Sequence, residues 1–132
     1  MSKRNGSQLV DIIPGRRIIF SKGVGNATAA DIRWLEQTIL TQAALWKTTG
    51  WAYVADCSEM APVAPAENLL LVEMTKKIVA SNCKALGFVD GKSILLKVQS
   101  KKNTENSNTG VPQEHFATKE EALAWLQKAH RI

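Results

Sequence analysis

The residue types best suited to chemistry are an aspartate and a serine at the end of one apolar segment, Asp56 and Ser58, and two histidines, His115 and His130. A serine nucleophile needs a general base within hydrogen-bond reach, and the histidines are the candidates for that role. Nothing in the sequence places either histidine beside Ser58. Aspartate and serine also dominate turns, because their side chains bond nearby main-chain amides. We therefore interpret Asp56 and Ser58 as capping or loop residues and predict that the chain is not an enzyme and has no catalytic residue.

Signals for a cofactor or a metal are weak. Residues 23–28, GVGNAT, imitate the start of the dinucleotide-binding fingerprint. Thr28, however, stands where a third glycine would allow close packing of helix on strand. Cys57 and Cys83 have no accompanying pair of histidines, and we interpret them as small buried apolar residues. We predict no cofactor and no metal site.

The composition is that of one globular domain. The chain has 132 residues, of which 45% are hydrophobic and 22% are charged, and this length is sufficient to bury a core. We expect a single domain over residues 1–132, with residues 1–8 and about 102–112 flexible. The first residues lack the apolar run of a signal peptide, and two cysteines are too few for a disulfide framework. We therefore expect a cytoplasmic location, with peripheral association with the membrane as a variant of it.

The net charge of +5 is concentrated in one segment. Residues 75–104 contain seven lysines and one aspartate, so the rest of the chain is close to neutral. One interpretation is a solvated lysine face that maintains solubility. The other is attraction to an anionic lipid surface or an acidic protein. We exclude nucleic acid as a partner, because arginine is sparse in this segment and no aromatic residues alternate with the lysines to stack on bases.

The candidate residues must be positioned by alternating strands and helices. Apolar segments on both sides of Pro14-Gly15 predict a hairpin. Thr28 and Thr118 each precede an apolar helical pattern and are expected to cap a helix. Three further segments predict strands: WAYVADC (51–57), ALGFV (85–89) and QEHF (113–116). A leucine-rich helix is expected after Pro65. Residues 58–65 are expected to form a turn, and residues 93–101 fit a strand or a helix equally well.

This order predicts an α/β fold. We expect a single mixed, mostly parallel β-sheet with an N-terminal β-hairpin and about four helices, in which the hairpin contributes one antiparallel edge strand. In such a sheet the carboxyl ends of the parallel strands form the usual binding edge. Asp56 and Asp90 should both lie there.

Four motifs resemble a known family. They are GVGNATAADI (23–32), WAYVADCSEMAPVAPAE (51–67), ALGFV (85–89) and HFATKEEALAWL (115–126). Their order and spacing are similar to those of SpoIIAA-like domains of the STAS fold, which are related to bacterial anti-sigma-factor antagonists. The resemblance implies a regulatory module that binds a protein.

One motif departs from the family pattern. Antagonists of this fold carry an Asp-Ser-Ser-Gly turn after the central strand, where a serine is phosphorylated to break a complex. The corresponding turn here, from Met60 to Pro65, contains no hydroxyl group. Ser58 lies too close to the end of the strand to correspond to that serine. We therefore expect no switch by serine phosphorylation.

These observations predict a binding module that uses residues 58–77. The helix after Pro65 is apolar over more of its surface than one sheet contact can cover, and lysines follow its leucines. We expect it to bind an apolar or amphipathic, lipid-like ligand or an anionic membrane surface. The alternative is a protein partner at the same surface, and a homodimer is a further alternative. The predicted ligand- or partner-binding residues are Asp56, Ser58, Met60, Leu69, Leu70, Met74, Lys76, Lys77 and Asp90.

Overall fold

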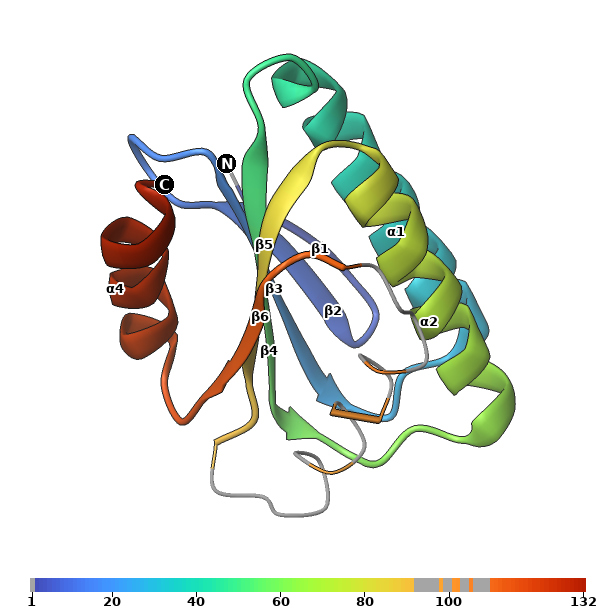
Figure 1. Ribbon diagram of the computed structural model, residues 1–132. Helices are drawn as coiled ribbons and strands as arrows, with labels where there is room; N and C mark the ends of the chain where they lie inside the picture. The colour runs from blue at the N-terminus through green and yellow to red at the C-terminus, as the bar shows by residue number, and fades with distance from the viewer. Residues whose placement is uncertain (1, 92–97, 99–100, 103–104, 106–109) are drawn as a thin grey trace.

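The computed structural model describes residues 2–91, 98, 101–102, 105 and 110–132. Its centre is a six-stranded sheet in which the spatial order of the strands is their order in the chain (Figure 1). The strands are β1 (Ser2–Asn5), β2 (Gln8–Ile12), β3 (Ile18–Gly25), β4 (Trp51–Met60), β5 (Cys83–Val89) and β6 (Gln113–Phe116). The expected hairpin around Pro14-Gly15 and the three expected strands after it are all present.

The sheet is mixed, and it has more antiparallel pairing than the sequence predicted. Strands β3 to β6 are parallel to one another, whereas β1 pairs antiparallel with β2, and β2 with β3. The sequence predicted one antiparallel strand, contributed by the hairpin. The second arises because Ser2–Asn5, in a segment expected to be flexible, turns at Gly6 and pairs with β2. Gly6 has a φ of +56°, a conformation that glycine adopts without strain.

Three α-helices are present in the described part of the chain, and they cover both faces of the sheet. Helices α1 (Ala29–Ala43) and α2 (Pro65–Ala80) pack on one face, and α4 (Lys119–His130) packs on the other (Figure 1). A short 3-10 helix, η1 (Ala44–Trp46), extends α1. The sequence predicted about four helices. The fourth was one reading of residues 93–101, most of which lie outside the described residues.

Local signals begin each helix where the sequence placed it. Thr28 Oγ1 accepts a hydrogen bond from the Asp31 amide, and the Asp31 carboxylate accepts one from the Thr28 amide, which completes a capping box. Thr118 Oγ1 accepts from the Glu121 amide in the same way at the start of α4. Helix α2 instead begins with Pro65, whose fixed φ suits the first helical position.

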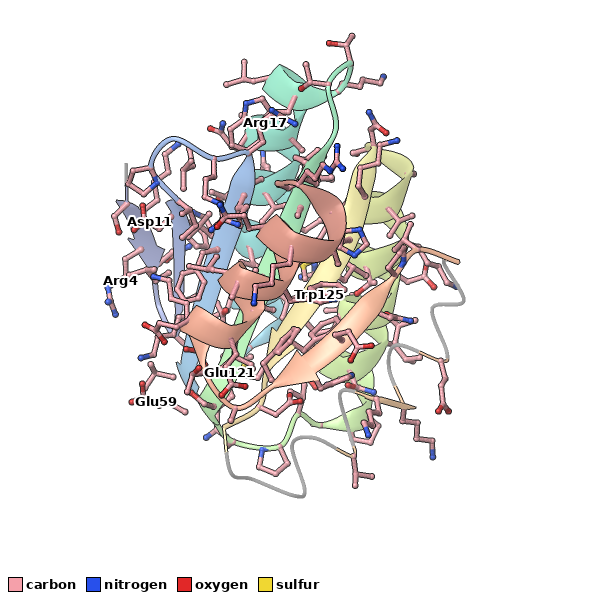
Figure 2. The ribbon with its side chains drawn as sticks, turned by 60° about the vertical axis from the view of Figure 1, so that its left-hand side comes forward. Arg4, Asp11, Arg17, Glu59, Glu121 and Trp125 are labelled. Atoms are coloured by element: carbon pink, nitrogen blue, oxygen red, sulfur yellow. The ribbon has the colours of Figure 1, made fainter. Side chains whose placement is uncertain are left out.

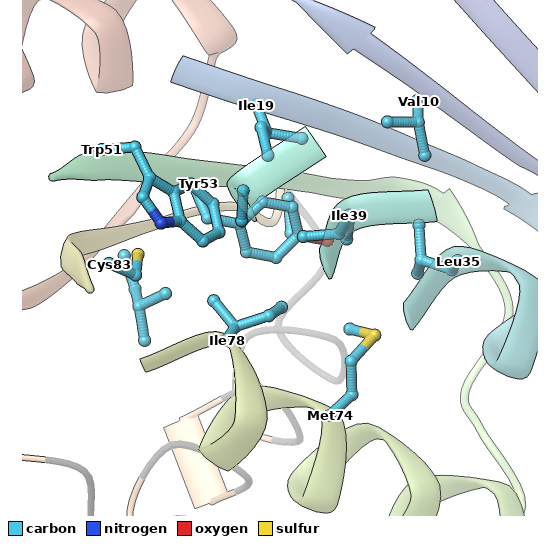
Figure 3. Close-up of a cluster of buried hydrophobic side chains, with 12 residues drawn as sticks. Val10, Ile19, Leu35, Ile39, Trp51, Tyr53, Met74, Ile78 and Cys83 are labelled. Carbon is cyan, nitrogen blue, oxygen red and sulfur yellow. The ribbon is translucent and has the colours of Figure 1, made fainter. Parts of the chain in front are cut away.

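The core consists of two apolar layers, one on each side of β4. Trp51 and Tyr53 point toward α1 and α2, where they meet Ile39 and Ile78 (Figure 3). Ala52 and Val54, which alternate with them along the strand, point toward α4. Because side chains alternate along a strand, a strand that is covered on both faces must be apolar at nearly every position. This explains why WAYVADC is the clearest strand pattern in the sequence.

Candidate functional site

Strand β4 is longer than the sequence predicted, and this changes the surroundings of Ser58. The sequence placed Ser58 in a turn that runs to Pro65. In the structure β4 continues to Met60, because Glu59 and Met60 align with Val24 and Gly25 of β3. The connection to α2 is therefore only residues 61–64. Ser58 lies within a strand rather than at the start of a loop.

Asp56 and Ser58 form a local hydrogen-bonded pair. Asp56 Oδ1 accepts from the Ser58 amide at 2.9 Å and from the Ser58 hydroxyl at 2.6 Å. The Asp56 side chain is buried, so these bonds offset the loss of water at its carboxylate. Asp56 thus satisfies a nearby main-chain amide, as the sequence analysis expected, whereas the Ser58 hydroxyl bonds the Asp56 side chain within β4.

A second polar pair, which the sequence analysis did not find, joins Asp90 to His115. Asp90 Oδ2 lies 2.6 Å from His115 Nδ1, and Asp90 is only 1% exposed. The imidazole also stacks on Phe88, with 5.2 Å between the ring centroids and 22° between the planes. The sequence signal that could have revealed this pair is the parallel pairing of the last two strands. This pairing aligns His115 with Phe88 and so places His115 next to Asp90, which lies two residues after Phe88.

Asp56 and Asp90 were expected to contribute to one site, but they lie on opposite faces of the sheet. Asp56 aligns with Val89, which packs in the layer beneath α4. Asp90 follows Val89 and, because side chains alternate, points toward the α1 and α2 face with Phe88 and His115. A pair of carboxylates acting together on one substrate is therefore not formed.

The Cys57 thiol is not set up as a nucleophile. Burial raises its pKa to about 12, and the neighbouring carboxylates of Asp90 and Asp56 act in the same direction. A thiol of this kind stays protonated at neutral pH, whereas catalytic and metal-binding cysteines act as thiolates. Among the residues that the structure describes, no group of three or more His, Cys, Asp or Glu side chains could hold a metal ion.

The apolar residues predicted to bind a ligand have different environments. Met74 is 4% exposed and belongs to the core, so it does not contribute to the exposed face of α2. Leu69, on the outer face of α2, is 66% exposed, and Leu70 is half-buried. Met60 is half-buried and lies against Gly23, where an added Cβ would come within 2.5 Å of its sulfur. Leu69 is thus the principal exposed apolar group of the predicted surface.

Lys76 and Lys77 are exposed, but each has an acidic partner. Lys76 Nζ lies 3.2 Å from Glu73, and Lys77 Nζ lies 3.3 Å from Glu36 of α1. Such surface pairs contribute only about 0–1 kcal/mol each to stability, but they reduce the local positive potential. In the sequence these lysines belong to a segment with few acidic residues, and the structure supplies each of them with a glutamate. Their attraction for anions is therefore weaker than the sequence predicted.

The turn before α2 carries no acceptor for a phosphate. Residues 61–64 are Ala-Pro-Val-Ala, and the residue at the helix N-cap, Ala64, makes no side-chain cap. The Ser58 hydroxyl is bonded to Asp56 within β4. On the neighbouring strand β3, Lys22 forms a hydrogen-bonded ion pair with Glu59 of β4. The hydrogen bond to Glu59 raises the pKa of Lys22.

None of the described helices is both long enough and apolar enough to span a membrane.

Comparison with solved structures decides the fold. An uncharacterized protein of the DUF3478 family from Shewanella loihica PV-4, described as having a SpoIIAA-like fold, superimposes with a TM-score of 0.72 and 20% sequence identity. The match covers 96% of this chain and 98% of that one. The chain has a SpoIIAA-like fold. The anti-sigma factor antagonist SpoIIAA in its unphosphorylated form also matches, with a TM-score of 0.62 and 13% identity over 90% of this chain and 96% of that one.

The fold expected from the sequence motifs is thus confirmed. No family model matches the sequence, and no curated protein matches it. In the SpoIIAA-like fold, the four parallel strands place the ends of β3 and β4 and the start of α2 at one edge. That edge is where the predicted binding surface lies.

Proposed function

We propose that this chain is a non-enzymatic regulatory module that binds a protein partner through the turn 61–64 and the outer face of α2. The observation that carries this proposal is Leu69, a leucine that is 66% exposed near the start of the surface helix α2. An exposed leucine alone is ordinary. Here it lies on the helix that follows the carboxyl edge of the parallel strands, a usual position for binding in α/β sheets. A similar fold belongs to an anti-sigma factor antagonist, which supports a protein as the partner.

The proposed module is not switched by phosphorylation in the turn. A phosphate added near the start of α2 would need a hydroxyl at or near Ala64, and the turn has none. Binding would then be controlled by the amount of the partner or by competition for it.

A lipid or an anionic membrane is the weaker occupant of the same surface. Leu69 and half-buried Leu70 would suit an acyl chain. The charges of α2 cancel, because it contains two glutamates and two lysines, and Lys77 pairs across to Glu36. Attraction of an anionic membrane, worth about 1 kcal/mol per unpaired lysine, is correspondingly reduced.

Two exposed leucines allow a matched test. A photoreactive amino acid is placed at Leu69 or at Leu45, which is 74% exposed in η1, and crosslinking is carried out in the native cell. We expect one defined protein adduct from position 69 that position 45 does not give. The purified partner should then bind the wild-type chain, and Leu69→Asp should weaken binding by about tenfold or more, as expected for a central apolar contact. Leu45→Asp should change it less than about twofold, and neither change should lower thermal stability much, because both side chains are exposed.

Two results would contradict the proposal. The first is the same adducts, or none, from both positions. The second is flotation of the wild-type chain with anionic liposomes that Leu69→Asp abolishes, which would assign the surface to lipid.

A further inference from the structure

A pocket of about 450 Å³ opens at the other end of the sheet, between the β2–β3 turn and the end of α4. Figure 1 shows this turn beside the end of α4, at the upper left. The lining residues are Gly15, Arg16, Arg17, Gln127, Arg131 and Ile132. Half of them are arginines, and none has an acidic side chain, although Ile132, the last residue of the chain, contributes its terminal carboxylate, which Arg16 binds. The volume is in the range of small-molecule sites, about 300–1,000 Å³.

Arg16 builds the wall of this pocket. Its guanidinium donates to the main-chain oxygen of Leu123 at 2.8 Å and to that of Ile132 at 3.1 Å from Nε. These bonds fasten α4 to the β2–β3 turn and fix the position of a positive charge. The role of Arg16 is therefore largely structural.

Arg17 and Arg131 provide the exposed cations. Arg17 Nε donates to the Gly50 oxygen at 2.9 Å, which holds the stem of a side chain that is otherwise exposed. Within the described ranges, no Asp or Glu side chain forms an ion pair with Arg17 or Arg131. Arg16 differs from them, because the Ile132 oxygen that it binds belongs to the carboxylate of the last residue in the chain. The charges of Arg17 and Arg131 are thus not neutralised by acidic side chains of the described residues, in contrast to those of Lys76 and Lys77.

The backbone of Arg131 is a second indication. Its φ is +56°, the left-handed conformation that usually follows a helix as glycine or asparagine. A residue with a Cβ is disfavoured there by about 1 kcal/mol or more. An arginine at this position is therefore unfavourable for the helix end itself, and a role for its side chain in the pocket accounts for it.

The surrounding surface has the same sign of charge. Four segments at this end of the molecule, residues 13–17, 44–50, 81–84 and 127–132, contain six lysines and arginines, and no aspartate or glutamate side chain. Glu59, by contrast, lies at the opposite end from Arg17 (Figure 2). A concave site within a region of one sign concentrates the potential and attracts ions of the other sign.

We propose that this pocket binds a small soluble phosphate ester. Guanidinium groups bind phosphate through paired N–H donors, and the two exposed ones, those of Arg17 and Arg131, suit a dianionic group with three exposed oxygens. The pocket is larger than a bare phosphate requires, so the organic part of the ester occupies the space beside Gln127 and Ile132. This site is separate from the proposed protein-binding surface, so the test of one proposal does not decide the other.

The test is a titration of the ¹⁵N-labelled full chain with glycerol 3-phosphate, with ionic strength held constant by sodium chloride. Amide shifts at Gly15, Arg17 and Arg131 should saturate, and glycerol alone should produce none. Arg17→Gln and Arg131→Gly should each weaken the affinity by about tenfold or more. Arg131→Gly is informative because glycine suits the left-handed position, so this variant should keep or raise the thermal stability while it loses binding.

Lys128→Gln is the matched control, because it removes one charge from the same helix without changing a residue that lines the pocket. It should weaken binding less than about twofold. Shifts that do not saturate, or a loss in Lys128→Gln equal to that in Arg131→Gly, would overturn the proposal. Flotation with phosphatidic acid vesicles without saturation by glycerol 3-phosphate would overturn the assignment to a soluble ester.

Discussion

Asp90 and His115 connect two neighbouring parallel strands through a carboxylate–imidazole hydrogen bond of 2.6 Å. Asp90 lies immediately after β5, and His115 lies within β6. Strand β6 has four residues and lies at the edge of the described sheet, so this side-chain bond supplements few main-chain bonds. A carboxylate that is 1% exposed would be strongly unfavourable without such a partner.

His115→Ala should therefore destabilise the fold by about 2–4 kcal/mol, because it leaves the Asp90 carboxyl buried without its imidazole. The free energy of unfolding in urea measures this. His130→Ala is the control. The described ring contact of His130 is with Trp125, at 4.7 Å between the centroids, and we expect a loss of about 1 kcal/mol or less. Equal losses in the two variants would show that the Asp90–His115 bond contributes nothing specific.

Asp31 should make stability depend on acid. Burial alone would raise its pKa, but hydrogen bonds from Ser7 and Thr28 outweigh burial and lower the pKa below its ordinary value of 3.8. A lowered pKa stabilises the fold above that value, and the stabilisation is lost as the pH falls through the folded-state pKa. Asp31→Asn should lose about 1 kcal/mol at pH 7.

Denaturation at pH 7 and at about pH 3 checks this prediction. The gap between wild type and Asp31→Asn should narrow at the lower pH. Glu120→Gln, an exposed acidic residue in the first turn of α4, should show a much smaller gap at both pH values. A gap for Asp31→Asn that does not change with pH would contradict the assignment.

The two thiols should be unreactive in the folded protein. Burial raises the pKa of both Cys57 and Cys83 to about 12, from an ordinary value of 9.0. Labelling with a disulfide reagent at pH 8 should be slow in the native state and fast for both thiols in denaturant. Because both pKa values are raised, stability should also decrease as the pH rises above 9.0. Rapid native labelling that Cys57→Ser abolishes would show that Cys57 is accessible and ionised.

Gly91 should be intolerant of a side chain for two separable reasons. Its φ is +62°, and an added Cβ would lie 2.9 Å from Ser58 Cβ. Gly15 has a similar φ of +73° with nothing within 4 Å of the same position. Gly15→Ala should therefore be destabilised by about 1 kcal/mol from backbone strain alone. Gly91→Ala should lose about 1–3 kcal/mol more from overlap with Ser58. Similar losses at both positions would mean that the end of β4 can move away.

The parts of the fold that could be predicted are those with local causes. Thr28, Thr118 and Pro65 act within one turn of the helices that they begin, and the alternation or continuity of apolar residues predicts the strands without knowledge of their neighbours. Strand β1 could not be predicted in this way, because Ser2–Asn5 is polar and exposed and pairs only because β2 is already in place.

The candidate site depended on relations between elements, and these were harder to predict. Met74 and Leu69 are both apolar residues of α2, and only the packing of that helix distinguishes the core residue from the exposed one. The relation of Lys77 to Glu36 requires knowing that α1 and α2 are adjacent. The separation of Asp56 from Asp90 depends on the strand register, since a difference of one residue reverses the face.

The strand order has a consequence for synthesis on the ribosome. Each strand pairs with the one made just before it, so the sheet can grow during translation without waiting for a distant segment. One face, however, is covered by α4, the last helix to emerge. Until α4 docks, Ile18, Phe20 and Val54 remain exposed to solvent. The nascent chain therefore passes through a stage in which a nearly complete sheet exposes an apolar, aggregation-prone face. Chaperone binding during synthesis should therefore be strongest just before residues 119–130 leave the exit tunnel.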